Sequence, residues 1–281
     1  MEDKDLSFWS SPGPDLISEF KEAVWEHYWR EGRDFPWRNI DNSWGILVSE
    51  VMLQQTQTSR VVPYWLRWME LWPNPQALAS ASLEAVLREW AGLGYNRRGR
   101  FLKLAAEKIV SDFNGQVPRT REDLMKLPGI GTYTAGAILC FAYNEPVVFI
   151  ETNIRAALIH FFYHDDKNVS DSSLLPILEQ VLDREKPRLW YYALMDYGAR
   201  LKKLTENPGR RSAHYNRQSR FKGSLREARG YIVRQLAEKG PATLDQLSAS
   251  TDIEYERLQS ALDALQKEQM VAEQSGLYQI V

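Results

Sequence analysis

Glu50 and Glu151 are the residues of this chain whose surroundings most favour chemistry. Glu50 lies within an expected helix from Trp44 to Gln57, in the apolar run ILVSEVML. Burial there would raise the pKa of its carboxyl above the usual value of about 4.3, so that it could donate a proton near neutrality. The alternative is that Glu50 lies on a solvated face of this helix, shared with Ser49, Gln54 and Gln57.

Glu151 follows a Pro-Gly-x-Gly turn, an expected helix from Thr134 to Ala142 and an apolar segment. Gly129 and Gly131 allow the backbone to turn sharply and bring N–H groups of a helix N-terminus close to an anion. Such a turn can hold a DNA phosphate without reading its base, although an ordinary packing corner between two helices has the same pattern. A carboxylate would repel that phosphate, but it suits the positive charge that develops on a sugar when an N-glycosidic bond breaks.

Four blocks of the sequence resemble the helix-hairpin-helix DNA glycosylases, most strongly the MutY adenine glycosylases and the related mismatch thymine glycosylases. They occur in the family's order and cover roughly residues 30 to 200. The blocks are DFPWR (Asp34 to Arg38), SEVMLQQTQTSRVVPYWLRW (Ser49 to Trp68), WAGLGYNRRGRFLKLA (Trp90 to Ala105) and LPGIGTYTAGAI (Leu127 to Ile138), the last followed by a carboxylate and Asn.

The resemblance implies catalytic roles for four residues. Glu50 aligns with the general acid that protonates the departing adenine. Glu151 would stabilise the cationic sugar or capture it briefly, and would position water. Tyr133 would form a hydrogen bond in the active site, and Asn153 would orient Glu151.

The resemblance also implies contacts with DNA. The turn Gln54-Gln55-Thr56 would fill the space that a flipped base leaves in the duplex. Tyr95 would lie beside the base opposite the target, or else would cap the following helix. Backbone contacts would come from a basic loop and from the hairpin, through Arg97, Arg98, Gly129, Gly131 and Thr134.

The chain departs from the family's pattern in three places. Tyr133 stands where bifunctional relatives have a lysine, which implies a monofunctional glycosylase without strong AP-lyase activity, because a phenol forms no Schiff base. Glu151 stands where the family has Asp. Cys140 is the single cysteine, whereas a [4Fe–4S] cluster is normally held by four, so we expect no iron–sulfur ligands, no metal and no cofactor.

Composition adds few constraints. The formal net charge of −2 does not indicate a nucleic-acid-binding protein, but the distribution of charge matters more than its sum. No apolar run approaches the roughly 18 residues of a membrane span, and the charged start from Met1 to Asp5 has no signal-peptide core. We expect a monomeric, cytoplasmic, nucleoid-associated protein without membrane contact, whose partner is double-stranded DNA carrying a mismatched or damaged base.

These observations predict an all-α, two-lobed helix-hairpin-helix DNA glycosylase fold with a C-terminal winged-helix-like domain. We expect residues 1–45 plus 141–200 to form a terminal helical lobe, and residues 46–140, with the hairpin at 124–142, to form an inserted lobe. Residues 201–223 replace the cluster segment with a basic linker that either runs along DNA, packs on the catalytic domain or is solvated.

The sequence of residues 224–281 predicts three helices followed by a β-hairpin with Ser275-Gly276 at its turn. The third helix, YERLQSALDALQKE, carries Glu256, Asp263 and Glu268. Its acidity argues against insertion into a major groove and favours a packing or protein-contact role at least as well.

The predicted function is hydrolysis of the N-glycosidic bond of a flipped base, with adenine opposite 8-oxoguanine or guanine as the leading substrate. Thymine or uracil in G·T or G·U mismatches is the alternative, because those relatives share the Tyr133 position and the DFPWR block. A non-catalytic protein that binds DNA lesions is the alternative from another class, and the presence of Glu50 argues against it.

Overall fold

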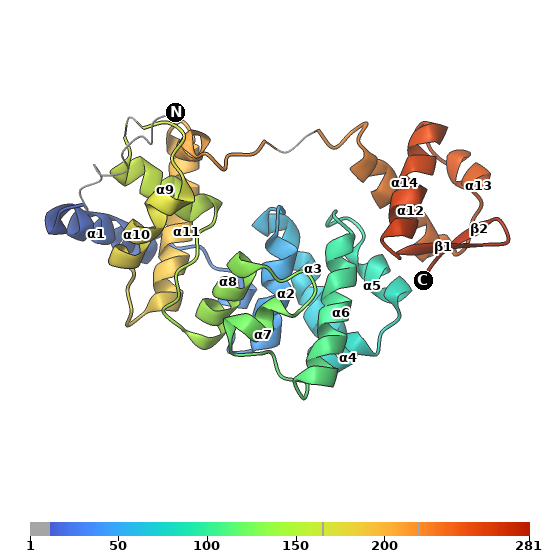
Figure 1. Cartoon of the computed structure of the whole chain (residues 1–281), viewed down its shortest axis with the longest axis horizontal. Coiled ribbons are helices and arrows are strands. Elements are labelled where there is room, and N and C mark those ends of the chain that lie inside the picture. The colour runs from blue at the N-terminus through green and yellow to red at the C-terminus, as the bar shows by residue number, and fades with distance from the viewer. Residues whose placement is uncertain (1–11, 165, 218–219) are drawn as a thin grey trace, which may run out of the picture. The chain divides into compact units, whose positions relative to one another are not determined.

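The computed structural model describes residues 12–164, 166–217 and 220–281, and the regular secondary structure in them is almost entirely helical (Figure 1). Within these residues the two strands, β1 (Val271–Gln274) and β2 (Leu277–Ile280), pair antiparallel with Val271 opposite Ile280. The prediction of an all-α fold with a small C-terminal hairpin is confirmed. In the described part of the chain, no helix is both long enough and apolar enough to cross a membrane.

The chain separates into two compact units. Among the described residues, the first unit comprises 12–34 and 139–217, and the second comprises 35–138 and 220–281. The lobe boundaries predicted from the sequence lie later, after residues 45 and 140. Residues 1–11 of the predicted terminal lobe and 218–219 of the predicted linker lie outside the described residues.

The first unit is built on α11, which packs against α9 and α1. The ring of Phe20 in α1 contacts Phe161, Phe162 and Trp190 with centroids 5.1 to 6.2 Å apart, so aromatic side chains form the core. The elements of this unit are α1 (Pro14–Glu31), α9 (Thr152–Phe162), α10 (Asp171–Val181), α11 (Pro187–Leu204) and η2 (Pro208–Arg211).

The predicted basic linker is partly ordered on this unit. Helix α11 continues to Leu204, and η2 packs on α9. Arg211 donates hydrogen bonds to the carbonyl oxygens of Ile159, Tyr163 and His164, which lie at and just beyond the C-terminal end of α9. Its guanidinium therefore pairs with the carbonyls of Tyr163 and His164 just beyond the helix, and adds a second hydrogen bond to the Ile159 carbonyl, which already accepts the Tyr163 N–H group.

The second unit surrounds α2, in which Trp44 to Met52 are all buried. Asn42 accepts hydrogen bonds from the N–H groups of Trp44 and Gly45 and so caps its N-terminus. The elements before the hairpin are η1 (Pro36–Arg38), α2 (Ser43–Leu53), α3 (Thr58–Leu71), α4 (Pro75–Ala79), α5 (Leu83–Trp90), α6 (Arg97–Asp112) and α7 (Arg121–Met125). Helix α8 (Thr132–Tyr143) crosses from this unit into the other.

The C-terminal subdomain, residues 225–281, belongs to the second unit. It comprises α12 (Leu225–Lys239), α13 (Leu244–Ser248), α14 (Tyr255–Lys267) and the hairpin β1–β2. Its apolar core is formed by residues such as Ile232, Leu262 and Met270, and it includes Leu87 from α5. The subdomain is therefore not closed on itself, because a residue of another helix completes its core.

Candidate active site

Glu50 lies on the central helix α2 with only 5% of its surface exposed. The hydroxyl of Tyr133, in the first turn of α8, donates to Glu50 Oε2 at 3.5 Å, at the long limit for a hydrogen bond. The alternative of a solvated face is thus excluded for Glu50. A buried carboxyl with a phenol beside it is suited to hold and deliver a proton.

The hairpin between α7 and α8 presents both of its turn glycines at the surface. Gly129 has φ +79°, and a Cβ there would lie 3.0 Å from Cβ of Phe101. Gly131 has open space where a Cβ would lie, so this side of the turn is accessible to a ligand.

Thr134, predicted to contact DNA, is placed differently. Its side chain is 3% exposed, and its Oγ1 accepts a hydrogen bond from Gln54 Nε2 at 3.3 Å. This placement is at odds with a direct DNA contact. Thr134 instead joins the hairpin to the Gln54-Gln55-Thr56 turn.

The Gln54-Gln55-Thr56 turn is the point where α2 ends, and its middle residue is exposed with φ +55°. Gln55 is therefore the residue that this turn presents to solvent. Arg98 fixes the turn through hydrogen bonds. Its Nη1 donates to the carbonyl oxygens of Val51, Met52 and Gln54, and its Nη2 donates to Thr56 Oγ1.

The prediction that Arg98 contacts DNA directly is at odds with this geometry. The side chain is 9% exposed, and Nη2 also donates to the carbonyl oxygens of Leu93 and Gly94. Burial lowers the pKa of the guanidinium to about 10, which leaves it charged at neutral pH. Arg98 therefore positions two loops rather than binding a phosphate.

Tyr95 and Arg97 lie in the loop between α5 and α6 and at the start of α6. Tyr95 has φ +50°, and its hydroxyl accepts a hydrogen bond from Arg226 Nη1 at 2.7 Å. The Arg97 side chain is exposed, with its guanidinium carbon 4.7 Å from the centre of the Phe101 ring. Of the two predicted phosphate-binding arginines, Arg97 is the one at the surface.

Glu151 lies in the first unit as the N-cap of α9. Its Oε1 accepts from the N–H groups of Asn153 and Ile154 at 2.7 and 2.9 Å. Its Oε2 accepts from Thr152 Oγ1 and Asn153 Nδ2 at 3.0 and 3.1 Å. Four donors and the positive end of the helix dipole thus hold one negative charge in a fixed orientation.

Lys202 on α11 is a site residue that the sequence did not reveal. Its Nζ donates to Asn153 Oδ1 at 2.9 Å, so that lysine, asparagine and glutamate form a continuous chain of hydrogen bonds. Burial lowers the pKa of the Lys202 ammonium, while the charge of Glu151 opposes that shift. One turn earlier, Gly198 packs so closely that a Cβ there would lie 2.0 Å from the Asn153 carbonyl oxygen.

The structure therefore pairs Glu50 with Tyr133 in one unit, and Glu151 with Asn153 in the other. Among the described residues, no group of three or more His, Cys, Asp or Glu side chains is arranged to hold a metal ion.

Residues 48–180, which include both pairs, match the model of the HhH-GPD superfamily of base excision DNA repair proteins. The HhH-GPD region and its flanks are also similar to curated proteins. The chain is 48% identical over 147 residues to the adenine DNA glycosylase of Mycobacterium tuberculosis (strain ATCC 25618 / H37Rv), a match that covers 52% of this chain and 48% of that protein.

The mouse adenine DNA glycosylase is 39% identical over 195 residues, and the human one is 38% identical over 195 residues. Each match covers 65% of this chain, but only 38% of the mouse protein and 36% of the human protein. The chain thus matches less than half of the length of each of these three relatives.

Two solved structures share the fold at low sequence identity. A thermostable thymine-DNA glycosylase superposes with a TM-score of 0.58 at 23% identity, covering 66% of this chain and 87% of that chain. A trapped endonuclease III–DNA covalent intermediate superposes with a TM-score of 0.56 at 20% identity, covering 66% and 85%. The predicted helix-hairpin-helix DNA glycosylase fold is confirmed.

Proposed function

We propose that this chain is a monofunctional DNA glycosylase that releases adenine opposite 8-oxoguanine or guanine. The observation that carries the proposal is the buried Glu50 beside Tyr133, inside the HhH-GPD region of a chain 48% identical over 147 residues to a mycobacterial adenine DNA glycosylase. Burying a carboxyl until it is only 5% exposed costs free energy. A role as proton donor to the leaving base explains why a carboxyl occupies this position.

The reaction transfers one proton to the base and one hydroxide to the sugar. Glu50 gives its proton to a ring nitrogen of adenine as the C1′–N9 bond breaks, and the bonding electrons leave with the base. A water molecule adds its oxygen to C1′ and loses a proton to a carboxylate. The products are free adenine and an abasic site, with no change of oxidation state.

Glu151 supplies the negative charge that opposes the positive charge on the sugar. Its carboxylate is immobilised by four donors, so it does not have to reorganise as the charge develops. The additional methylene of Glu, compared with Asp, is accommodated because the side chain folds back onto the N-terminus of α9. We assign Asn153 the role of orienting this carboxylate.

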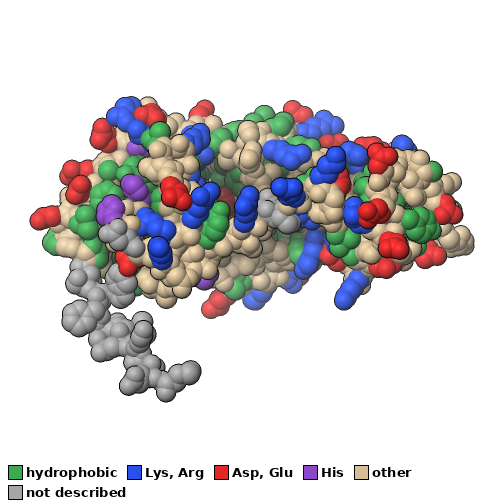
Figure 2. All heavy atoms as spheres, turned by 90° about the horizontal axis from the view of Figure 1, so that it is seen from above, with side chains coloured by type: hydrophobic (Ala, Val, Ile, Leu, Met, Phe, Trp, Pro, Cys, Tyr) green, Lys and Arg blue, Asp and Glu red, His purple; other side chains and the backbone are tan. Residues whose placement is uncertain are grey.

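DNA is the proposed partner, bound as a duplex by a single copy of the chain. Lys and Arg side chains are prominent on the face drawn in Figure 2, despite the net charge of −2. We assign DNA contacts to the exposed Arg97, to Gly129 and Gly131 of the hairpin, and to Gln55 at the tip of its turn. Gln54, Thr56, Thr134 and Arg98 would act by positioning that turn.

The test is single-turnover base release followed by alkaline cleavage of the abasic strand. The duplexes carry adenine opposite 8-oxoguanine or guanine, and thymine or uracil opposite guanine, with Glu50→Gln as the variant and Asp263→Asn, on an exposed part of α14, as the control. We expect adenine release that Glu50→Gln reduces by roughly 10²- to 10⁴-fold and Asp263→Asn leaves unchanged. Thymine or uracil release would instead identify a mismatch glycosylase, and binding without release would contradict the proposal.

The monofunctional assignment has its own assay, because a Schiff base between an amine and the abasic sugar is trapped by borohydride. Tyr133 offers no amine at the hairpin, and we expect no cross-link under conditions that give full base release. A cross-link would contradict the assignment, and its loss in Lys202→Met would locate the amine.

A further inference from the structure

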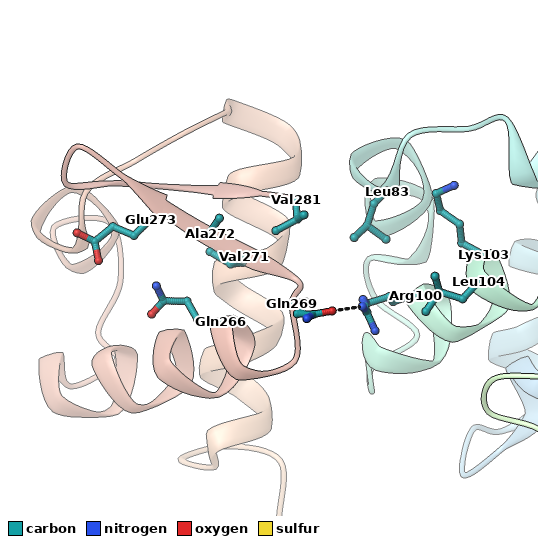
Figure 3. Close-up of a pocket in the computed structure, with 10 residues that line it drawn as sticks. All are labelled: Leu83, Arg100, Lys103, Leu104, Gln266, Gln269, Val271, Ala272, Glu273 and Val281. Atoms are coloured by element: carbon teal, nitrogen blue, oxygen red, sulfur yellow. Dashed lines mark hydrogen bonds between the residues drawn. The ribbon is translucent and has the colours of Figure 1, made fainter. Parts of the chain in front are cut away.

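The C-terminal subdomain docks on α5 and α6 of the same unit through apolar and polar contacts. Leu87 of α5 is fully buried in its core. Arg88 Nε donates to the Ala237 carbonyl oxygen at 3.0 Å, and Arg100 Nη2 donates to Gln269 Oε1 at 3.1 Å. Figure 3 shows the second contact at the edge of a hollow of about 650 Å³ that separates β1 and the end of α14 from α5 and α6.

A further contact of this subdomain reaches Tyr95, which the sequence resemblance led us to expect at the DNA. Arg226, in the first turn of α12, donates from Nη1 to Tyr95 Oη at 2.7 Å, and its guanidinium carbon lies 5.3 Å from the centre of the Tyr95 ring. The Arg98 guanidinium carbon lies 5.5 Å from the centre of the same ring. Tyr95 therefore has two cationic groups against its ring, one from the catalytic part and one from the C-terminal subdomain.

The backbone of Tyr95 requires such support. Its φ of +50° is a left-handed conformation that a bulky residue adopts rarely and at a cost. A charged hydrogen bond and cation–π contacts favour this position of the ring over its alternatives. Arg98 is itself fixed by six hydrogen bonds to two loops, so Arg226 is the support that the C-terminal subdomain controls.

We propose that Arg226 is a positioning residue for Tyr95, through which the C-terminal subdomain takes part in discriminating the base opposite the excised one. The inference rests on the proposed function and on the role expected for Tyr95 from the sequence, beside the base opposite the target. It gives the subdomain a role that does not require its acidic third helix to enter a DNA groove. The subdomain reads DNA indirectly, by holding a side chain of the catalytic part in place.

The experiment measures discrimination in binding and in catalysis with the full chain. Dissociation constants are measured by fluorescence anisotropy for duplexes that carry a 2′-fluoro-adenosine, which resists cleavage, opposite 8-oxoguanine, guanine or thymine. Single-turnover release rates are measured on the matching cleavable duplexes. The variants are Arg226→Met, Tyr95→Phe, the double variant, and Arg234→Met, which removes an equal charge from an exposed position of the same helix.

We expect Arg226→Met to reduce the preference for 8-oxoguanine over thymine about tenfold, while Arg234→Met keeps the wild-type preference. In the Tyr95→Phe background, Arg226→Met should cost much less, because the hydroxyl that it binds is already absent. Equal losses on all three duplexes would overturn the inference and leave Arg226 a structural or general DNA-binding residue. The inference would also be overturned if the effects of Arg226→Met and Tyr95→Phe on this preference were independent in the double variant. It would likewise be overturned if Arg226→Met behaved the same as Arg234→Met.

Failure of the proposed function gives a different result. A wild-type chain that discriminates opposite bases in binding but releases none would contradict the glycosylase assignment, while the binding ratios would still test Arg226. A wild-type chain that releases adenine, with variants that keep its discrimination, would overturn the Arg226 inference alone.

Discussion

Glu151 combines two properties that are separable by substitution. Its oxygens cap α9 by accepting two backbone N–H groups, and its negative charge is the feature that we assign to catalysis. Glu is not among the residues that most often cap helices. Here the side chain reaches the backbone N–H groups of the two residues that open α9 after Thr152, and it also accepts hydrogen bonds from the Thr152 hydroxyl and the Asn153 amide side chain.

Glu151→Gln keeps an oxygen for the backbone of α9 but removes the charge. We expect base release to fall by roughly 10²- to 10³-fold, with the melting temperature almost unchanged, as measured by single-turnover kinetics and circular dichroism. Glu151→Ala should lose both the rate and about 1 kcal/mol of stability. Wild-type release by Glu151→Gln would remove Glu151 from the chemistry.

We expect Lys202 to make the rate of base release depend on pH on the alkaline side. The ammonium is charged below its pKa, and burial lowers that pKa, so the charge next to Asn153 and Glu151 is lost at a lower pH than for an exposed lysine. We expect the release rate to fall as pH rises through this range, and Lys202→Met to be about tenfold slower with a flatter alkaline profile. Lys203→Met is the exposed neighbouring control, and a wild-type profile in Lys202→Met would contradict this role.

The success of prediction at single residues depended on how local their signals are. Glu50, Tyr133 and Glu151 lie in continuous motifs, so their roles could be proposed from the sequence. Arg98 was predicted to contact DNA because nothing in a glycine- and arginine-rich loop indicates which of its arginines is buried. Lys202 lies 49 residues from Asn153 in a basic stretch, and no pattern in the sequence joins the two.

At the scale of elements, the close contact between α11 and the start of α9 fixes the position of Glu151. Gly198 is the point of contact, because a Cβ there would lie 2.0 Å from the carbonyl oxygen of Asn153. Helix α11 is thus held against the residue that orients the carboxylate. A small residue in α11 determines where the cap of another helix lies.

Gly198→Ala should therefore shift the N-terminus of α9, costing about 1–3 kcal/mol of stability and slowing base release without touching a reacting group. Gly230→Ala in α12 is the matched control. A Cβ there meets nothing within 4 Å, and alanine should stabilise the helix by up to about 1 kcal/mol. Urea denaturation and single-turnover release measure both, and equal behaviour of the two variants would contradict the prediction.

Element boundaries were predicted well where the apolar period or the turn chemistry is strong. The third C-terminal helix was expected over the stretch YERLQSALDALQKE and is observed as Tyr255–Lys267. The hairpin turn falls at Ser275 and Gly276, with φ of +53° and +80°, the conformation that two-residue hairpins require. The sequence did not predict how residues 201–213 are placed. Hydrogen bonds from Arg211 and backbone pairing with Val169 help to hold this segment, and neither interaction leaves a periodic apolar pattern in the sequence.

At the scale of the whole molecule, the C-terminal subdomain and α5 share one apolar core through Leu87. Leu87→Ala should cost about 2–5 kcal/mol in the free energy of unfolding of the second unit, and should loosen the subdomain. Leu175→Ala in α10, whose side chain is 37% exposed, should cost far less. Chemical denaturation of the full chain measures both, and a small effect of Leu87→Ala would show that the subdomain is stable without α5.

The first unit is discontinuous in the chain, and this affects its biosynthesis. Helix α1 ends at Glu31, but α11, on which it packs, begins at Pro187. At ribosomal speeds of about 5–20 residues per second, roughly 8–30 s pass before the partner of α1 has been made. Until α9 and α11 have both been made, Phe20 and Val24, both fully buried in the finished protein, have no complete native core to enter. The nascent chain therefore exposes the apolar face of an amphipathic helix, which a chaperone can bind, while α2 to α6 of the other unit can already fold.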